Sequence, residues 1–245
     1  MTKILGISTG FDYKISGDMN QQIKIIRDLS LEGLINGIEL NFAFPEKLFN
    51  FEITEDNLNY LRSLKFVSIH LPWKKIIYSD NPRARGVLSS AETLYKIINA
   101  KNVVVHTDEI KDFRIFNDYD ICVSIENDDY KKGANTVEQI QELLDKNKNL
   151  GLTFDFAHAI SISNLEVDKY IQEFRQNISE IHLAMLDREM KDHWFLHKFK
   201  GDNLDNLIKS LKSLDAPIIL ECVARDSSEL PLIKKEIKYI INILK

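Results

Sequence analysis

The chain has 245 residues, a formal net charge of −5, 44% hydrophobic residues and 28% charged residues. This composition predicts one globular domain over residues 1–245 and excludes a largely disordered chain. No run of 18 apolar residues occurs, so we expect neither a transmembrane helix nor a membrane partner. Residues 1–10 have the pattern of a strand and not of a signal segment, so we expect a cytoplasmic location. The negative charge argues against a broad nucleic-acid-binding surface.

Short runs rich in Val and Ile alternate with longer amphipathic runs along the whole chain. The short runs predict eight strands: Lys3–Thr9, Gly37–Phe42, Lys65–Leu71, Asn102–Thr107, Ile121–Asn127, Leu150–His158, Ile178–Met185 and Pro217–Val223. The longer runs predict seven helices: Met19–Leu31, Thr54–Ser63, Ser89–Ala100, Thr136–Asp145, Asn164–Gln176, Asn203–Ser213 and Glu229–Leu244. Asn164, Asn203 and Thr136, with Gln139 three residues after Thr136, are predicted N-caps.

Strands that alternate with helices predict a parallel sheet, because parallel neighbours need a crossover connection. Eight such units at this length predict an α/β fold, a single (β/α)8 barrel with eight parallel strands. The alternative built from the same elements is a doubly wound open sheet. The link 108–119 is short and has room for one or two helical turns. Cys122 and Cys222 lie in Val- and Ile-rich stretches, so we predict two buried thiols and no disulfide.

Side-chain alternation places polar residues on one face of the predicted strands. Successive residues point to opposite faces, so His70 shares a face with Ser68, and Glu126 shares one with Ser124. The opposite face is apolar and is expected to pack on the outer helices. An ionisable residue comes late in seven strands: Glu39, His70, His106, Glu126, Asp155, His182 and Glu221. In a barrel these side chains would meet at the C-terminal mouth, where such barrels place their chemistry.

Burying so many ionisable groups together without compensation is costly. A divalent metal ion is the simplest compensation, and the carboxylate and imidazole set suits Zn, Mn or Co, with Mg also compatible. Taken singly, each carboxylate also fits a salt bridge or helix cap, and each histidine a hydrogen-bonded core residue. Glu39 fits an ion pair inside the barrel equally well.

The remaining histidines leave their roles open. His158 follows Asp155 by three residues and fits a metal ligand or a substrate contact. His193 and His197 lie four residues apart in the predicted loop 187–201 and would face the same way if that loop were helical. They fit a solvent-exposed pair of loop residues, or a pair of which one is a ligand.

Aromatic and basic residues follow the third and seventh predicted strands. Trp73 and Trp194 fit rings that stack on a sugar or a flipped base, or plain loop packing. The basic residues are Lys74, Lys75, Arg83 and Arg85 in the first loop and Lys198 and Lys200 in the second. They fit phosphate contacts or solvated surface charges. No Gly-rich phosphate loop occurs, so we expect no nucleotide cofactor.

Seven stretches in order resemble the xylose isomerase-like superfamily: GIEL (37–40), SIHLPW (68–73), VVVHTD (103–108), VSIEND (123–128), FDFAHA (154–159), EIHLAM (180–185) and ILECVA (219–224). The resemblance to its ketose epimerase branch implies a single metal held by Glu126, Asp155, His182 and Glu221. It further implies Glu126 and Glu221 as the acid/base pair and His158 and Arg188 as substrate contacts. The implied activity is isomerisation or epimerisation of a small sugar or polyol, or a related dehydration, by proton abstraction next to a metal-bound carbonyl.

The same stretches resemble the endonuclease IV branch, which holds three Zn ions. His70, His106, Glu126, Asp155, His158, His182 and Glu221 match ligand positions there. The sequence departs from that branch at two places. The branch has an aspartate and a histidine separated by one residue after the seventh strand, whereas the nearest match here is Asp192 and His193, which are adjacent. Residues 107–109 stand where the branch has a Gly-rich segment.

We therefore expect a metal-dependent isomerase or epimerase first. In it, His70, Trp73, His106 and Glu39 would contact a sugar-like substrate. A Zn-dependent endonuclease or phosphodiesterase, with nucleic acid as partner, is the alternative, and a non-catalytic binding barrel is the third hypothesis. A homo-oligomer is an open expectation, since barrels of this kind often associate.

Overall fold

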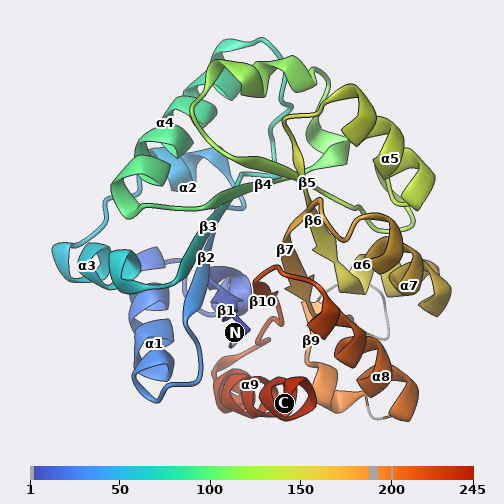
Figure 1. Cartoon of the computed structure of the whole chain (residues 1–245). Helices are drawn as coiled ribbons and strands as arrows, with labels where there is room; N and C mark the ends of the chain where they lie inside the picture. The colour runs from blue at the N-terminus through green and yellow to red at the C-terminus, as the bar shows by residue number, and fades with distance from the viewer. Residues whose placement is uncertain (1–2, 188–192, 200) are drawn as a thin grey trace.

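The computed structural model describes residues 3–187, 193–199 and 201–245. Eight parallel strands close into a barrel, and the helices lie around its outside (Figure 1). The strands are β1 (Leu5–Ser8), β2 (Gly37–Asn41), β3 (Phe66–His70), β4 (Asn102–His106), β5 (Val123–Glu126), β6 (Gly151–Asp155), β7 (Ile178–Leu183) and β10 (Ile218–Leu220). The predicted (β/α)8 barrel is confirmed, and the open-sheet alternative is wrong because β1 pairs with both β2 and β10.

The helices are α1 (Met19–Leu31), α2 (Pro45–Phe49), α3 (Glu55–Ser63), α4 (Pro82–Ile98), α5 (Val137–Lys146), α6 (Phe156–Ile162), α7 (Asn164–Glu173), α8 (Asp202–Ser210) and α9 (Leu230–Leu244). Short 3-10 turns lie between them, namely η1 (Thr9–Asp12), η2 (Thr107–Glu109), η3 (Phe113–Asp118), η4 (Leu196–Lys198), η5 (Leu211–Ser213) and η6 (Ser227–Glu229). The two turns η2 and η3 fill the link in which one or two helical turns were expected. Helices α2 and α6 were not predicted, because each is shorter than two full turns of periodic sequence.

Local capping decides where the helices begin. The Thr136 hydroxyl and the Gln139 side chain form the predicted capping box of α5. The prediction of Asn164 as an N-cap is wrong, because the Ser163 side chain accepts from the Glu166 amide and caps α7. Asn203 is also not a cap, since Gly201 occupies that position of α8.

Helix α4 begins seven residues before the predicted start at Ser89. The Asn81 side chain accepts from the Ala84 amide, and Pro82 takes the first helical position. Proline suits that position because its fixed backbone angle is helical and its missing N–H has no partner to lose. The helix ends at Asn99, which adopts the left-handed conformation.

The sixth strand ends earlier than predicted and thereby places His158. The Asp155 side chain accepts from the His158 amide at 2.6 Å and caps α6. Ala157, which falls within the predicted strand Leu150–His158, therefore lies in α6 instead. A second unpredicted element is a small antiparallel sheet of β8 (Met185–Leu186) and β9 (His193–Trp194).

The predicted polar face lines the inside of the barrel. Below the mouth, the Glu180 carboxylate accepts from Ser68 Oγ at 2.7 Å and from Asn102 Nδ2 at 2.8 Å, and the Ser124 and Thr153 hydroxyls contact each other at 2.5 Å. This polar layer has its hydrogen bonds satisfied, so the cost of burying it is offset. The apolar face packs on the helices as expected.

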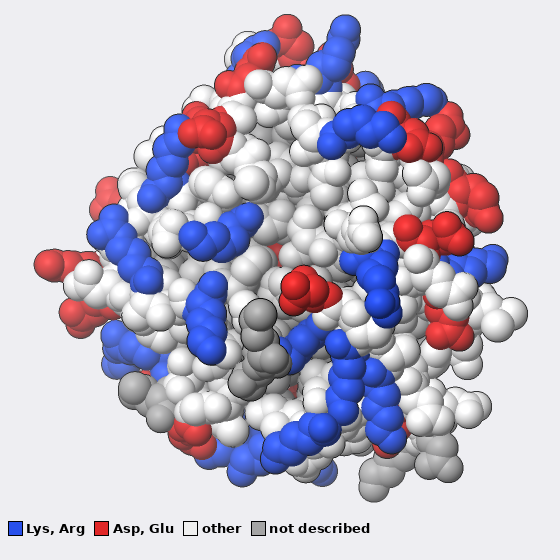
Figure 2. All heavy atoms as spheres, viewed as in Figure 1, with Lys and Arg blue, Asp and Glu red and all other residues white. Residues whose placement is uncertain are grey.

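The outer surface carries mixed charge. Figure 2 shows acidic and basic side chains side by side over most of one face, with Lys and Arg gathered over α8 and α9. The prediction that Cys122 is buried is wrong, because Cys122 lies just before the first residue of β5 and is exposed. Cys222 is buried as predicted, and both cysteines are free thiols. Among the described residues, no helix is long and apolar enough to cross a membrane.

Candidate metal centre

Four ionisable residues meet at the C-terminal mouth of the barrel. Glu126 ends β5, Asp155 ends β6, His182 lies on β7 and Glu221 follows β10 directly. All four are buried, and one ligand atom from each lies within 4.8 Å of the others. The barrel register brings these strand ends together although the residues are up to 95 positions apart in the sequence.

His182 lies between carboxylates on both sides of its ring. Its Nδ1 is 3.1 Å from Glu221 Oε2 and 3.4 Å from Glu126 Oε1, whereas its Nε2 is 3.0 Å from Glu39 Oε2. Burial lowers the pKa of His182, but the charges of Glu221, Glu39 and Glu126 outweigh it and hold that pKa well above 6.5. The ring thus presents Nδ1 to the mouth and Nε2 to a carboxylate beneath it.

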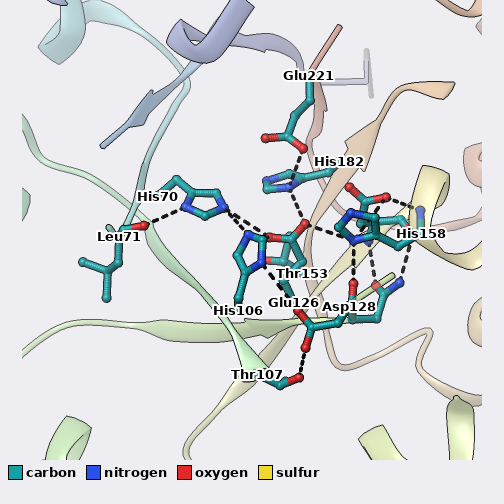
Figure 3. A network of polar contacts seen from close by, with 12 residues as sticks. His70, Leu71, His106, Thr107, Glu126, Asp128, Thr153, His158, His182 and Glu221 are labelled. Atoms are coloured by element: carbon teal, nitrogen blue, oxygen red, sulfur yellow. Dashed lines mark hydrogen bonds and ion pairs between the residues drawn. The ribbon is translucent and has the colours of Figure 1, made fainter. Parts of the chain in front are cut away.

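Glu126 also reaches a second group of potential ligands (Figure 3). Its Oε2 is 3.2 Å from His70 Nε2 and 3.4 Å from His106 Nε2, and those two nitrogens are 3.2 Å apart. Because its two oxygens face different histidines, Glu126 has the geometry of a carboxylate that bridges two positions. His70, His106 and Glu126 meet the same 4.8 Å criterion as the first four residues.

The histidines of this second group are oriented by oxygen atoms behind them. His70 Nδ1 is 2.9 Å from the Leu71 carbonyl oxygen, and His106 Nδ1 is 3.5 Å from Asp128 Oδ1. A ring whose Nδ1–H faces an oxygen presents the Nε2 lone pair to the opposite side, as metal-binding histidines do. Both Nε2 atoms point to Glu126.

Asp155, His158 and His193 form a third group. His193 Nε2 is 3.6 Å from Asp155 Oδ2, and its Nδ1 is 3.3 Å from Glu221 Oε2. His158 Nδ1 is 2.8 Å from the Asn127 carbonyl oxygen and 3.7 Å from Asp155 Oδ1. The first group shares Glu126 with the second and Asp155 with the third, so the three make up one continuous centre.

The donor set of this centre fits a divalent cation. Asp155 is fully buried, and among the described residues its Oδ2 has no hydrogen-bond donor. Burial opposes a proton on His106, yet the Glu126 charge and Asp128 raise its pKa to about 10, and a similar balance raises the pKa of His193 to about 9. Protons on these rings therefore balance the carboxylates, a role that a metal ion would take over on binding.

A cavity of about 210 Å³ opens on the centre from the mouth. His70, His106, Glu126, His158, His193 and Glu221 line it, together with Trp73, Tyr13, Asn41 and Lys132. Trp73 stacks on His106, with ring centroids 6.0 Å apart and planes at 16°. The Glu39 side chain is not part of this wall, because it lies beneath His182 and is fully buried.

Other candidate residues lie elsewhere. His197 does not face the same way as His193: its Nδ1 is 2.6 Å from Glu236 Oε2 of α9, away from the mouth. Arg83 pairs with Glu46, and Arg85 pairs with Asp80 and Asp118, on the outer surface. Arg188, Asp192 and Lys200 lie outside the described residues.

Three further residues shape the centre and were not selected from the sequence. Asp128 follows Glu126 by two positions, so side-chain alternation over residues 123–128 places it on the same face as Glu126. The same alternation puts Glu180 beside His182. No sequence signal indicates Glu236, because its contact with residues 196–197 depends on how a loop crosses a helix 39 positions later.

The sequence of residues 101–243 matches the model of the xylose isomerase-like TIM barrel family. The chain belongs to this family. No curated protein resembles the sequence closely enough to count as a match.

Solved structures share the fold over nearly the whole length. One is a D-tagatose 3-epimerase-like protein with 19% identity, a TM-score of 0.67 and 98% of each chain covered. A second is endonuclease IV from Thermus thermophilus, with 14% identity, a TM-score of 0.67 and 98% of this chain and 97% of that chain covered. A third is 3-keto-D-glucoside 4-epimerase from E. coli, with 10% identity, a TM-score of 0.69 and coverage of 98% and 100%. These structural neighbours include an epimerase-like protein, an epimerase and an endonuclease, and the shared fold does not fix the activity.

Proposed function

We propose that this protein is a divalent-metal-dependent isomerase or epimerase of a small sugar-like substrate. The observation that carries the proposal is the placement of Glu126 and Glu221. Both reach the same nitrogen of His182, at 3.4 and 3.1 Å, and both line the mouth cavity. They come from β5 and from the end of β10, which are separated in the barrel by β6 and β7. A substrate in the cavity would therefore meet carboxylates from two directions.

Glu126, Asp155, His182 and Glu221 would hold a divalent ion, which supplies polarisation of a carbonyl or hydroxyl oxygen when bound. Burial raises the pKa of Glu126 and of Glu221, but the neighbouring histidine charges outweigh burial and hold both pKa values well below 4.5. Both carboxylates are thus ionised at neutral pH. One can take a proton from the carbon next to the carbonyl and return that proton to a neighbouring atom. The other, once it has taken up a proton from solvent, can deliver it to the opposite face.

The cavity supports a small substrate. About 210 Å³ is room for a compact molecule, and its walls combine polar strand-end groups with the Trp73 ring. His158 and His193 lie on the wall, where they can hydrogen-bond hydroxyl groups. A dehydratase acting on a similar substrate would use the same carboxylates.

A metal-dependent phosphodiesterase is the second candidate, and the bridging geometry of Glu126 favours it. A second ion at His70, His106 and Glu126 would sit beside the first, and paired ions suit phosphoester hydrolysis. The third group, Asp155, His158 and His193, offers a further position.

Proton abstraction can be tested without knowing the product. Metal-loaded protein is incubated with ketopentoses and ketohexoses in D2O, and exchange at the carbon next to the carbonyl is followed by proton NMR. We expect exchange with at least one sugar, abolished by Glu126→Gln or Glu221→Gln. Glu142→Gln, on the exposed surface of α5, is the matched control and should exchange like the parent protein.

Full exchange in both site variants would refute the assignment of the two carboxylates. Absence of exchange with every sugar, combined with cleavage of bis(p-nitrophenyl) phosphate or nicking of abasic-site DNA, would establish the phosphodiesterase instead.

A further inference from the structure

The side chain of Lys74 is enclosed by aromatic rings at the edge of the mouth. Its Nζ lies 4.3 Å from the ring centroid of Trp73, 5.4 Å from that of Phe44 and 5.9 Å from that of Tyr13. The backbone fixes this position, since the Lys74 amide donates to the Ala43 carbonyl oxygen at 2.9 Å and Lys75 follows in the left-handed conformation. The rings attract the ammonium group through their π faces but do not neutralise it.

Lys74 differs from the arginines of its loop and from the lysine of the mouth by having no carboxylate partner among the described residues, and from Lys75 by its place. Lys75 Nζ also lies near the Phe44 ring, at 5.7 Å, but Lys75 is exposed and lines neither cavity. Arg83 and Arg85 are paired with carboxylates on the outer surface, and Lys132, on the mouth wall, is 3.5 Å from Asp129. Within residues 3–187, 193–199 and 201–245, no carboxylate forms an ion pair with Lys74. It therefore retains a full positive charge that is available to a ligand.

The position of Lys74 links the metal centre to a second cavity. Trp73 lines the mouth and stacks on His106 at 6.0 Å, so Lys74 Nζ lies no more than about 10 Å from the His106 ring. Lys74 itself lines an adjoining groove of about 690 Å³, and Tyr13, Asn41 and Ala43 line both spaces. A molecule that spans the boundary would touch the centre at one end and Lys74 at the other.

We propose that Lys74 binds the anionic end of the substrate, a phosphate or carboxylate group on a small polyol whose other end reaches Glu126 and Glu221. This inference rests on the proposed function and specifies its substrate class. The carboxylates of the centre repel an anionic substrate, and Lys74 provides the compensating attraction where the anion would lie.

The anion is placed at the boundary of the two cavities and not deeper in the groove. Besides Lys74, the groove wall carries one further lysine, Lys47, against Asp18, Glu46 and Glu52, so the carboxylates outnumber the lysines away from Lys74 and disfavour an anion there. The wall near Lys74 is formed by the uncharged rings of Phe44 and Tyr13.

Trp73 supplies a direct probe of this site. The chain has two tryptophans, so Trp194→Phe leaves Trp73 as the only tryptophan, excited selectively over tyrosine, with the Lys74 ammonium over its ring. Metal-loaded protein is titrated with glycerol 3-phosphate, glycerate and glycerol. We expect saturable changes in emission with one or both anions and none with glycerol at equal concentration. The stronger of the two anions identifies the phosphate or the carboxylate.

Lys74→Gln should weaken binding of that anion about tenfold or more, the size expected for loss of one charge-assisted hydrogen bond. Lys75→Gln is the matched control and should bind like the parent. Calorimetric titration of the natural chain and of Lys74→Gln repeats the comparison without the Trp194 substitution.

Equal affinity of Lys74→Gln and the parent for both anions would overturn the inference, as would equal binding of glycerol and the anions. These outcomes leave the sugar-exchange result untouched. Conversely, Lys74-dependent anion binding by a protein that exchanges no carbon-bound proton in ketoses or in ketose phosphates would retain the anion site and reject the isomerase.

Discussion

Glu236 of α9 holds His197 through a contact of 2.6 Å between Oε2 and Nδ1, and both side chains are buried. The same carboxylate accepts from the Leu196 amide at 2.6 Å and from the His197 amide at 3.0 Å. It therefore fixes η4, which lies three residues after the His193 that enters the metal centre. The Val223 amide, which donates to the His193 carbonyl oxygen at 3.1 Å, ties the same segment to the end of β10.

Removal of the Glu236 carboxylate is predicted to destabilise the protein. Glu236→Ala leaves two amides and an imidazole nitrogen buried without their acceptor, at about 1–3 kcal/mol for each unsatisfied group. We expect a loss of about 3 kcal/mol or more in the free energy of unfolding, measured by urea denaturation. Glu142→Ala, which removes an exposed ion pair, should change it by less than about 1 kcal/mol. Similar losses in the two variants would contradict this role for Glu236.

Stability of the metal-free protein is predicted to fall at alkaline pH. The pKa values of His193 and His106 are raised from 6.5 to about 9 and about 10 in the folded state, by carboxylates whose effect exceeds that of burial. Protonation of these rings stabilises the fold fully below pH 6.5, and this contribution is lost as the pH rises through 9 and 10. A metal ion replaces those protons, so the metal-loaded protein should lose less.

The measurement is the melting temperature between pH 6.5 and 10.5 with and without metal. A melting temperature of the metal-free protein that stays constant over this range, or falls in parallel with that of the loaded protein, would count against the predicted exchange of protons for metal.

Metal stoichiometry is predicted to depend on which group is altered. If Glu126 bridges two ions, His70→Gln should remove one ion per chain and retain the one at Asp155, His182 and Glu221. Glu126→Gln should weaken binding at both positions. Elemental mass spectrometry of untagged protein, loaded with Zn or Mn and freed of excess metal, counts the ions directly. One ion per chain in both the parent and His70→Gln would exclude the second position and favour the single-metal isomerase.

Glu39 is predicted to act on metal affinity without being a ligand. Its Oε2 lies 3.0 Å from His182 Nε2, on the side of the ring away from the mouth. Carboxylates behind a metal-binding histidine raise its basicity and fix its orientation, and their loss typically weakens binding about 10–100-fold. Glu39→Gln should therefore weaken metal binding in a competition titration with a chelator, whereas Glu52→Gln should not. Unchanged metal affinity in Glu39→Gln would show that the contact between Glu39 and His182 is an internal ion pair without influence on the metal.

The sequence by itself determined the barrel and which strand-end residues face its interior. Strand alternation has a period of two, so Ser68 and His70, or Ser124 and Glu126, face the interior whatever surrounds them. A strand-end position is equally local, which is why the ionisable residues of seven strands could be identified before any distance was known. The predicted end of the sixth strand was wrong because the Asp155 side chain forms a cap with the His158 amide, and this competes with strand extension.

Only the tertiary structure decided which of those residues contact one another and which of them reach the cavity. The register of eight strands places the two oxygens of Glu126 toward different histidines and puts Glu39 beneath His182, out of the cavity. The path of each loop separates His193 from His197 and Lys74 from Arg83 and Arg85, although the sequence presents each set as equivalent. The physical reason is that alternation is a property of one strand, whereas a contact between side chains depends on the relative positions of elements far apart in the chain.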